Sequence, residues 1–312
     1  MKVNILCSRM ALQESEKGAG MGSGKRRFGD RHDGRRLRSL HPYNAMIPFV
    51  MKYRGDSSNY FEDAVEITDI ERFLRGKRLN GYPGMGFLHL FIATYIKTTV
   101  QYPGLNRFVS GQRVYTRDSI EFVMTIKKEM RADAPETSVK VSFDKRDTIN
   151  DVYNKLNLEI NKVKSEGEDT GTDNLAKFFV KLPRLILKLT VSFLGTLDYF
   201  GLLPKSIINA SPFHGSVIIT DLGSIGLNAV YHHLYNFGNL PLFIAIGPKR
   251  KTRELRIDGS VAECKYIDYR IVMDERICDG FYISQALKQF RSFLRSPQSL
   301  DEPTETIVED VD

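Results

Sequence analysis

The feature that most constrains this 312-residue chain is a strand, a polar turn and a helix that follow one another near its C-terminus. Residues 266–273 alternate in polarity and are rich in β-branched and aromatic side chains, which predicts a strand. Asp279 stands at the N-cap position of the following helix, where its carboxylate can accept hydrogen bonds from the first free amides. That helix has one apolar face, made by Ile283, Ala286, Leu287, Phe290, Phe293 and Leu294. A turn held in this way commonly fixes a reactive side chain at the mouth of a pocket.

The turn itself resembles a known catalytic signature. After Asp274 it reads Glu275-Arg276-Ile277-Cys278-Asp279-Gly280. This is similar to the His-x-x-x-Asp-Gly signature of chloramphenicol acetyltransferase and of the acyltransferases of 2-oxo acid dehydrogenases, in which His is the general base on a thiol or hydroxyl. Asp279 and Gly280 match the Asp-Gly pair, and Asp274 and Arg276 match the dehydrogenase form Asp-His-Arg. Glu275 stands where the family has its His.

A second stretch carries the same resemblance. Residues 217–223 read Val-Ile-Ile-Thr-Asp-Leu-Gly, similar to the family segment Thr-Ile-Ser-Asn-Leu-Gly, a strand that brings a hydroxyl into the active site. Thr220 matches that hydroxyl, which binds the oxyanion of the tetrahedral intermediate, and Asp221 and Gly223 match its neighbours. One such donor contributes roughly 3–4 kcal/mol to lowering the barrier. Thr220 and Glu275 are 55 residues apart, a separation similar to the family's.

The resemblance covers roughly residues 43–296 and implies a fold, an activity and an assembly. The fold is the chloramphenicol acetyltransferase-like α/β sandwich of two layers with a mixed sheet, here with an inserted helical hairpin near residues 170–210. The activity is acyl transfer between coenzyme A, or another thiol carrier, and an acceptor. The assembly is a homotrimer with active sites between subunits, in which Glu275 of one chain faces Thr220 of its neighbour. The catalytic candidates are therefore Glu275, Asp279 and Thr220.

The elements between these motifs fit that fold. Strands are predicted at 60–67, 113–115, 120–126, 139–143 and 242–246, and helices at 68–79, 88–103 and 147–164. Thr68-Asp69-Ile70-Glu71 predicts a capping box at the start of the first helix. Basic residues at 249–256 and the turn Asp258-Gly259 predict a hairpin. This order resembles that of the acyltransferase catalytic domain.

The charges of the chain are concentrated near its two ends. Residues 25–54 hold nine basic and two acidic residues, and residues 297–312 hold six acids and no base. We expect a flexible leader at 1–24, a basic arm at 25–54, the acyltransferase-like domain at 55–296 and an acidic disordered tail at 297–312. The arm either contacts phosphates of coenzyme A, nucleic acid or anionic lipid, or packs on a neighbouring subunit with its charges in solvent. We favour packing, and expect no nucleic-acid partner, because no aromatic residues alternate with the basic ones.

Cysteine usage bears on the compartment and on metals. The three cysteines, Cys7, Cys264 and Cys278, are widely spaced and form no Cys-x-x-Cys pair. This spacing argues against a disulfide framework or a zinc site and fits a reducing compartment. The first residues lack the apolar core of a signal peptide. We therefore expect a cytoplasmic protein without a metal.

The insertion allows two interpretations. Residues 175–208 are rich in Leu and Phe, and Lys177, Lys181, Arg184 and Lys188 recur at spacings that place them on one helical face. Residues 175–203 could lie in an anionic membrane surface or cover an acyl-binding channel. The alternative is a helical hairpin that packs on the core with its Lys and Arg in water. No apolar run reaches the roughly 20 residues of a membrane span.

Two function hypotheses follow from Glu275. In the first, Glu275 is the general base of an acyltransferase. A carboxyl group has an ordinary pKa of about 4.3, so burial would have to raise it for work on a thiol near 8.5. In the second, the chain is an inactive relative that acts as a trimeric binding or scaffold module, and Glu275 forms a salt bridge with an arginine. The adjacent His232 and His233 do not chelate one ion by themselves, and we expect packing roles for both, although one could line the pocket.

Overall fold

The computed structural model describes residues 26–127, 136–165, 173, 177 and 179–312. The chain divides into two units, residues 1–30 and residues 31–312. In the first unit the Asp30 carboxylate accepts a hydrogen bond from the Arg27 amide at 2.8 Å, and Gly29 has a φ of 88°. Glycine is the residue that adopts this left-handed conformation without strain, so a tight turn forms there. The leader predicted at 1–24 lies outside the described residues.

A mixed sheet of six strands forms the centre of the second unit. Its strand order is β2 (Ser58–Glu66), β9 (Val261–Asp274), β8 (Leu242–Leu255), β7 (Val217–Asp221), β5 (Ile120–Lys127) and β6 (Glu136–Phe143). β7 runs parallel to both of its neighbours, and the other pairs are antiparallel. The sequence predicts all six strands, and the mixed sheet confirms the expected fold class.

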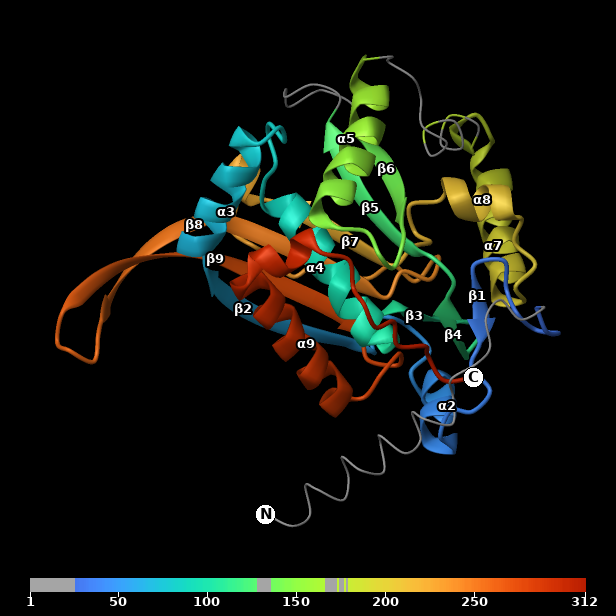
Figure 1. The fold of residues 1–312 in the computed structure, drawn as a ribbon. Coiled ribbons are helices and arrows are strands. Elements are labelled where there is room, and N and C mark those ends of the chain that lie inside the picture. Colours follow the sequence, from blue (N-terminus) through green and yellow to red (C-terminus); the bar gives the residue numbers. More distant parts are fainter. Residues whose placement is uncertain (1–25, 128–135, 166–172, 174–176, 178) are drawn as a thin grey trace, which may run out of the picture. The chain divides into compact units, whose positions relative to one another are not determined.

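Four helices cover one face of this sheet, as Figure 1 shows: α3 (Thr68–Leu79), α4 (Phe87–Gln101), α5 (Ile149–Ser165) and α9 (Gly280–Arg295). Their apolar stripes pack on alternate strand residues such as Ile219, Ile244 and Met273, and together these residues make the main core. Each large side chain that is fully buried contributes roughly 1.5–3 kcal/mol to folding. The sheet and this helix layer form the predicted two-layer sandwich.

The start of α3 differs from the prediction. Thr68 is the first helical residue rather than the cap, and its hydroxyl donates to the Glu66 carboxylate at 3.1 Å. The N-cap is Ile67, which is fully buried and whose amide still donates to the Lys265 carbonyl at 2.9 Å. The predicted capping box is therefore wrong, because the pairing with β9 continues through the N-cap residue Ile67.

Residues 31–54 of the arm belong to the second unit and join the rest of that unit through a second, small sheet. β1 (Gly34–Arg36) pairs with β4 (Arg113–Arg117), which also pairs with β3 (Arg107–Ser110), and α2 (Pro42–Val50) follows β1. Arg31 and Arg54 are buried. This differs from the expectation that the charges of the arm lie in solvent.

The C-terminal residues also differ from the expected disordered tail. Residues Pro297–Asp301 form a short 3₁₀ helix, and Leu300 is buried. Further on, the Asp310 carboxylate pairs with Arg107 at 2.5 and 2.8 Å. The Asp312 carboxylate pairs with Arg35 at 3.0 Å. The acids that would keep an isolated tail solvated are thus held by basic residues of the folded unit.

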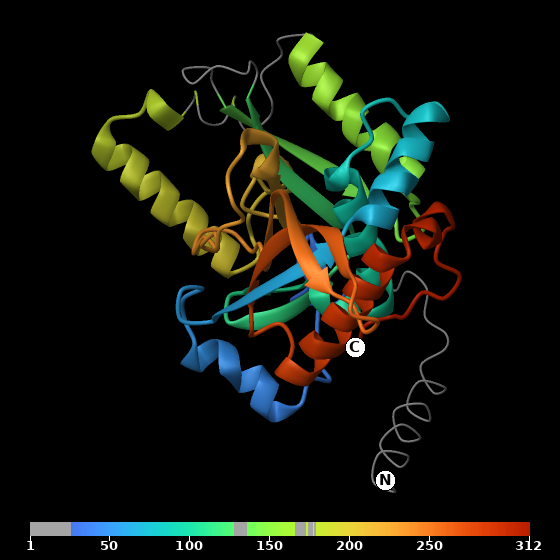
Figure 2. The same ribbon diagram turned by 90° about the vertical axis from the view of Figure 1, so that its left-hand side faces the viewer.

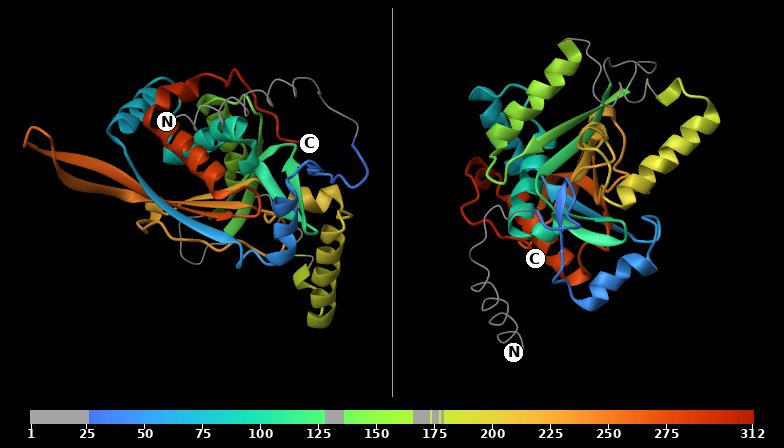
Figure 3. Two further views of the ribbon diagram at one scale, coloured as in Figure 1. Left: turned by 90° about the horizontal axis from the view of Figure 1, so that it is seen from below. Right: turned by 90° about the vertical axis from the view of Figure 1, so that its right-hand side faces the viewer.

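The insertion forms α7 (Arg184–Tyr199) and α8 (Lys205–Ala210). Figures 2 and 3 show α7, in yellow, on the side of the sheet opposite to α4, α5 and α9. The ends of β8 and β9 extend beyond the sheet as a long hairpin, visible in orange in Figure 1. Within the described ranges, no helix is long and apolar enough to cross a membrane.

Candidate active site

A buried ion cluster holds the turn that carries Glu275. Asp274 is fully buried and forms a bidentate pair with Arg276, with Nε–Oδ1 and Nη2–Oδ2 distances of 2.8 and 2.6 Å. Arg276 Nη1 also donates to the Met51 carbonyl at 2.9 Å. Arg54 Nε lies 3.8 Å from Asp274 Oδ2. Two arginines therefore share one carboxylate, and this carboxylate links the turn to the arm.

Arg54 extends the cluster into the neighbouring loops. It donates to the carbonyls of Tyr235 at 2.8 Å and Val109 at 3.3 Å. Burial lowers the pKa of Arg54 to about 10, although Asp274 acts to raise it, and the positive charge of Arg276 lowers it further. The guanidinium is still protonated at neutral pH, so the cluster depends on Asp274 for its negative charge.

The Glu275 side chain has no partner of its own in the part of the chain that the structure describes. Its backbone amide donates to the Ser57 carbonyl at 2.8 Å, and its side chain is partly exposed. The two nearby arginines, Arg54 and Arg276, form their ion pairs with the carboxylate of Asp274 and not with that of Glu275. Among the described residues of one chain, Glu275 therefore does not form the salt bridge that the scaffold hypothesis needs.

Asp279 and Cys278 complete the turn. Asp279 is exposed, and its Oδ1 accepts a hydrogen bond from the Tyr282 amide at 2.9 Å, which confirms the predicted N-cap of α9. Gly280 is the first helical residue. Cys278 is buried, and burial raises the pKa of its thiol to about 12. A thiol of this kind is a poor nucleophile at neutral pH, and Asp279 acts on the helix rather than on Glu275.

Thr220 lies near the end of β7, as predicted. Its hydroxyl oxygen is buried and has no hydrogen-bond partner among the described residues. A buried hydroxyl without a partner is uncommon, because leaving it unpaired costs about 1–3 kcal/mol. Such a group is available to a ligand that reaches it.

The residues after Thr220 shape the end of the strand. Asp221 Oδ1 accepts a hydrogen bond from the Ser224 amide at 3.0 Å. Burial raises the pKa of Asp221, and the amide hydrogen bonds oppose this effect. A side chain at Gly223 would collide with the backbone of Gly247, so only glycine fits there. The motif residues thus set the turn that follows Thr220.

His232 lies on the same side of the sheet as Thr220, opposite to the four helices. Its ring stacks on Phe243 with centroids 4.2 Å apart, and Phe243 pairs with Ile218, two residues before Thr220. The Nε2 atom of His232 is buried without a partner among the described residues. Burial, and then His233, lower the pKa of His232, so the neutral imidazole is favoured at neutral pH. The His-His pair was a sequence signal for this residue, but only the fold places His232 on the same face of the sheet as Thr220.

The strand register separates Glu275 from Thr220 within one chain. In the strand register, Thr220 is paired with Ala245 of β8, and Ala245 is paired with Arg270 of β9. Glu275 lies five residues beyond Arg270 in the sequence and two strands away, which corresponds to about 16 Å along the strand direction alone. A single chain therefore does not bring these two residues together.

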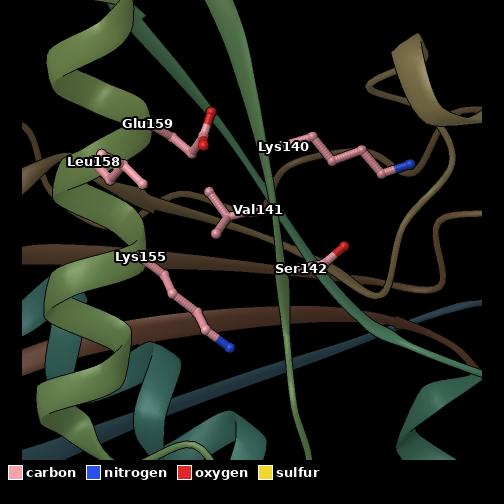
Figure 4. Close-up of a pocket in the computed structure, with 6 residues that line it drawn as sticks. All are labelled: Lys140, Val141, Ser142, Lys155, Leu158 and Glu159. Carbon is pink, nitrogen blue, oxygen red and sulfur yellow. The ribbon is translucent and has the colours of Figure 1, made fainter.

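A cavity of about 160 Å³ lies elsewhere, between β6 and α5. Figure 4 shows Lys140, Val141 and Ser142 on the strand, and Lys155, Leu158 and Glu159 on the helix. Ligand sites usually measure about 300–1,000 Å³, and this cavity contains no motif residue. In the described part of the chain, no group of three His, Cys, Asp or Glu side chains could hold a metal ion.

Solved structures with similar folds agree with this architecture. A probable dihydrolipoamide acetyltransferase from Listeria monocytogenes matches 83% of this chain and 95% of its own, with a TM-score of 0.54 and 13% identity. The truncated catalytic core of the 2-oxoacid dehydrogenase multienzyme complex from Thermoplasma acidophilum matches 84% of this chain and 98% of its own. Its TM-score is 0.51 and its sequence identity is 12%. The chain has the fold of these acyltransferase cores.

A chloramphenicol acetyltransferase also resembles it, with a TM-score of 0.45 and 12% identity over 81% of this chain and 94% of its own. No protein-family model matches the sequence, and no curated protein sequence does. The assignment of the acyltransferase-core fold therefore rests on the two structures with the higher TM-scores. Because their sequence identity to this chain is low, the likeness shows the fold alone.

Proposed function

We propose that this protein transfers an acyl group between coenzyme A, or another thiol carrier, and an acceptor. The observation that carries the proposal is that the side chains of the two motif residues, Glu275 and Thr220, lack partners among the described residues. The Glu275 carboxylate is unpaired on a turn held by the Asp274–Arg276 pair, and the Thr220 hydroxyl is buried without a partner, both among described residues. Unpaired polar groups on a rigid support are typical of catalytic sites.

The roles follow from the chemistry of acyl transfer. The Glu275 carboxylate accepts the proton of the attacking thiol or hydroxyl, whose sulfur or oxygen then bonds to the carbonyl carbon of the donor. The negative charge that develops on the carbonyl oxygen is stabilised by a hydrogen bond from the Thr220 hydroxyl. The intermediate collapses with loss of the carrier thiolate, which takes the proton back from Glu275.

The site requires more than one chain, since one chain keeps Glu275 and Thr220 apart. We therefore propose a homotrimer in which Glu275 of one subunit faces Thr220 of the next. Exposed apolar side chains on α2 and on the long hairpin support this proposal, because isolated chains rarely leave such patches open. These side chains are Met46, Phe49, Val50, Leu255, Ile257 and Val261.

Light scattering coupled to gel filtration tests the assembly. The trimer should have a mass three times 35.6 kDa at micromolar concentration. Replacing Phe49 and Ile257 with serine should lower that mass, because the interface would lose apolar area. Leu79→Ser is the matched control, since this exposed residue lies at the end of α3. A monomer in the unmodified protein would contradict the shared site.

Thr220 gives a direct test of the oxyanion role. Thr220→Val should lower the rate constant of acyl transfer by roughly 10²–10³-fold, the typical effect of removing one such donor. The melting temperature should not fall, because the hydroxyl has no hydrogen bond to lose among the described residues. Thr220→Ser keeps the hydroxyl and is the control, with activity close to that of the unmodified protein. Full activity in Thr220→Val would remove Thr220 from the mechanism.

A second candidate function is a trimeric scaffold without catalysis. This function is favoured if the protein does not bind acyl-coenzyme A and if Glu275 pairs with an arginine of a neighbouring subunit. Calorimetric titration with coenzyme A and acetyl-coenzyme A separates the two candidates. Saturable binding supports the enzyme, and its absence supports the scaffold.

A further inference from the structure

One end of α7 is fixed to the body of the protein. Asp198, in its last turn, is buried and pairs with Arg31 at 2.6 Å. The Tyr199 hydroxyl donates to Gln112 at 2.7 Å. Gly111 permits this contact, because a side chain there would collide with the Tyr199 carbonyl. The last turn of α7 is therefore rigidly attached, which fixes the direction of the whole helix.

The outer face of α7 is apolar and uncovered. The exposed fractions of its side chains are 74% for Leu185, 69% for Leu189 and 61% for Phe193, and Phe200 at its end is 67% exposed. Spacings of four residues place the first three on one stripe of the helix. Leu194 and Asp198, which are buried, lie on another side. The apolar stripe thus faces away from the core rather than toward it.

A basic stripe runs beside the apolar one. Lys181, Arg184 and Lys188 are exposed, and within the described residues they make no ion pair. Arg184 and Lys188 are four residues apart on α7, so they share a face roughly 120° from the apolar stripe. Lys181 lies in the turn before the helix, ahead of the N-cap Pro183, and is therefore not part of the single helical face expected from the sequence. The acidic residue of α7, Asp198, is buried and already paired with Arg31. This surface therefore carries positive charge with no compensating acid on the same helix.

We propose that α7 docks on an anionic lipid surface. An apolar stripe next to a row of cations is the pattern of helices that lie in the plane of the interface. Sixteen residues extend about 24 Å, which suits a helix lying on the membrane. Phospholipid headgroups supply the negative charge that the basic stripe attracts. This role is independent of acyl transfer.

The charge distribution favours lipid over a second copy of the chain. Another copy would have to present acids to Lys181, Arg184 and Lys188. Among its acidic C-terminal residues, Asp310 and Asp312 already pair with Arg107 and Arg35. A bilayer offers both the apolar layer and the anionic layer at the required depths.

Co-sedimentation of the full chain with vesicles tests the proposal. Vesicles of phosphatidylcholine and phosphatidylserine should bind the protein at low salt, and vesicles of phosphatidylcholine alone should bind it weakly. The bound fraction should fall as salt is raised toward about 1 M, where the screening length is about 3 Å. Arg184→Gln with Lys188→Gln should lower the partition coefficient about 25-fold, since each cation contributes about five-fold.

The apolar stripe is tested separately with Leu189→Ser and Phe193→Ser together, which should also abolish most binding. Controls are Leu79→Ser and Lys288→Gln, exposed residues of α3 and α9, and these should bind like the unmodified protein. The proposal would be overturned if the unmodified protein did not bind the phosphatidylserine vesicles at low salt. It would also be overturned if the variants of the basic and apolar stripes bound these vesicles as well as the controls do. Stripe variants that lose the trimer while keeping vesicle binding would assign this face to subunit contact instead.

Discussion

Glu275→Gln is expected to lower the rate constant of acyl transfer by roughly 10²–10⁴-fold, the usual contribution of a general base. Glutamine has nearly the same shape but cannot accept the proton. The affinity for acetyl-coenzyme A should hold, and so should the melting temperature, because the carboxylate has no partner among the described residues of its own chain. Thiol release from acetyl-coenzyme A, isothermal titration and thermal unfolding measure the three quantities.

Glu275→His is the companion variant, because it restores the residue that the resembling family has at this position. Acetyl transfer should be retained or raised, and the pH optimum should move toward an imidazole pKa of about 6.5. The pH profiles of both proteins give the comparison. Unchanged turnover in Glu275→Gln together with a lower melting temperature would show a structural salt bridge across subunits and support the scaffold.

Asp274→Ala is expected to have the largest effect on stability. It leaves Arg54 and Arg276 buried without the carboxylate they share. Breaking a buried pair by removing one partner costs roughly 3–5 kcal/mol of unfolding free energy. Urea denaturation monitored by circular dichroism measures this loss. Activity should fall as well, since the turn that holds Glu275 would no longer be fixed.

Asp279→Ala is the matched control for that experiment. It removes an exposed carboxylate of the same turn that caps α9, and such a cap contributes roughly 0.5–2 kcal/mol. A smaller loss than that of Asp274→Ala is therefore expected. Equal losses in the two variants would indicate that the buried cluster contributes little beyond the cap.

Much of the fold could be predicted because its elements have strong local patterns. Alternation in β9 and the apolar stripe of α9 follow from neighbouring residues, and Asp279 caps the helix as its position indicates. The start of α3 could not be predicted in the same way. The continued pairing of Ile67 with β9 makes Thr68 helical, and strand pairing is not encoded in the four residues of a capping box.

The candidate site shows the same division. The motif positions Glu275 and Thr220 come from the sequence, but the sequence leaves open whether Glu275 pairs with an arginine. The fold directs Arg54 and Arg276 to Asp274 instead. It also places His232 on the face of Thr220, through stacking on Phe243. Neither result follows from spacing, because each depends on segments far apart in the chain.

By itself, the sequence determined where the strands of the main sheet and its four covering helices lie, because periodicity and caps act over a few residues. It did not predict β1, β3 or α2, whose residues form the small second sheet and the helix beside it. Only the tertiary structure decided which charges are neutralised and which apolar stripes stay uncovered. The C-terminal acids meet Arg35 and Arg107, while the outer stripe of α7 faces solvent. Charge pairing and burial depend on distances between remote segments, and these distances are set when the chain folds.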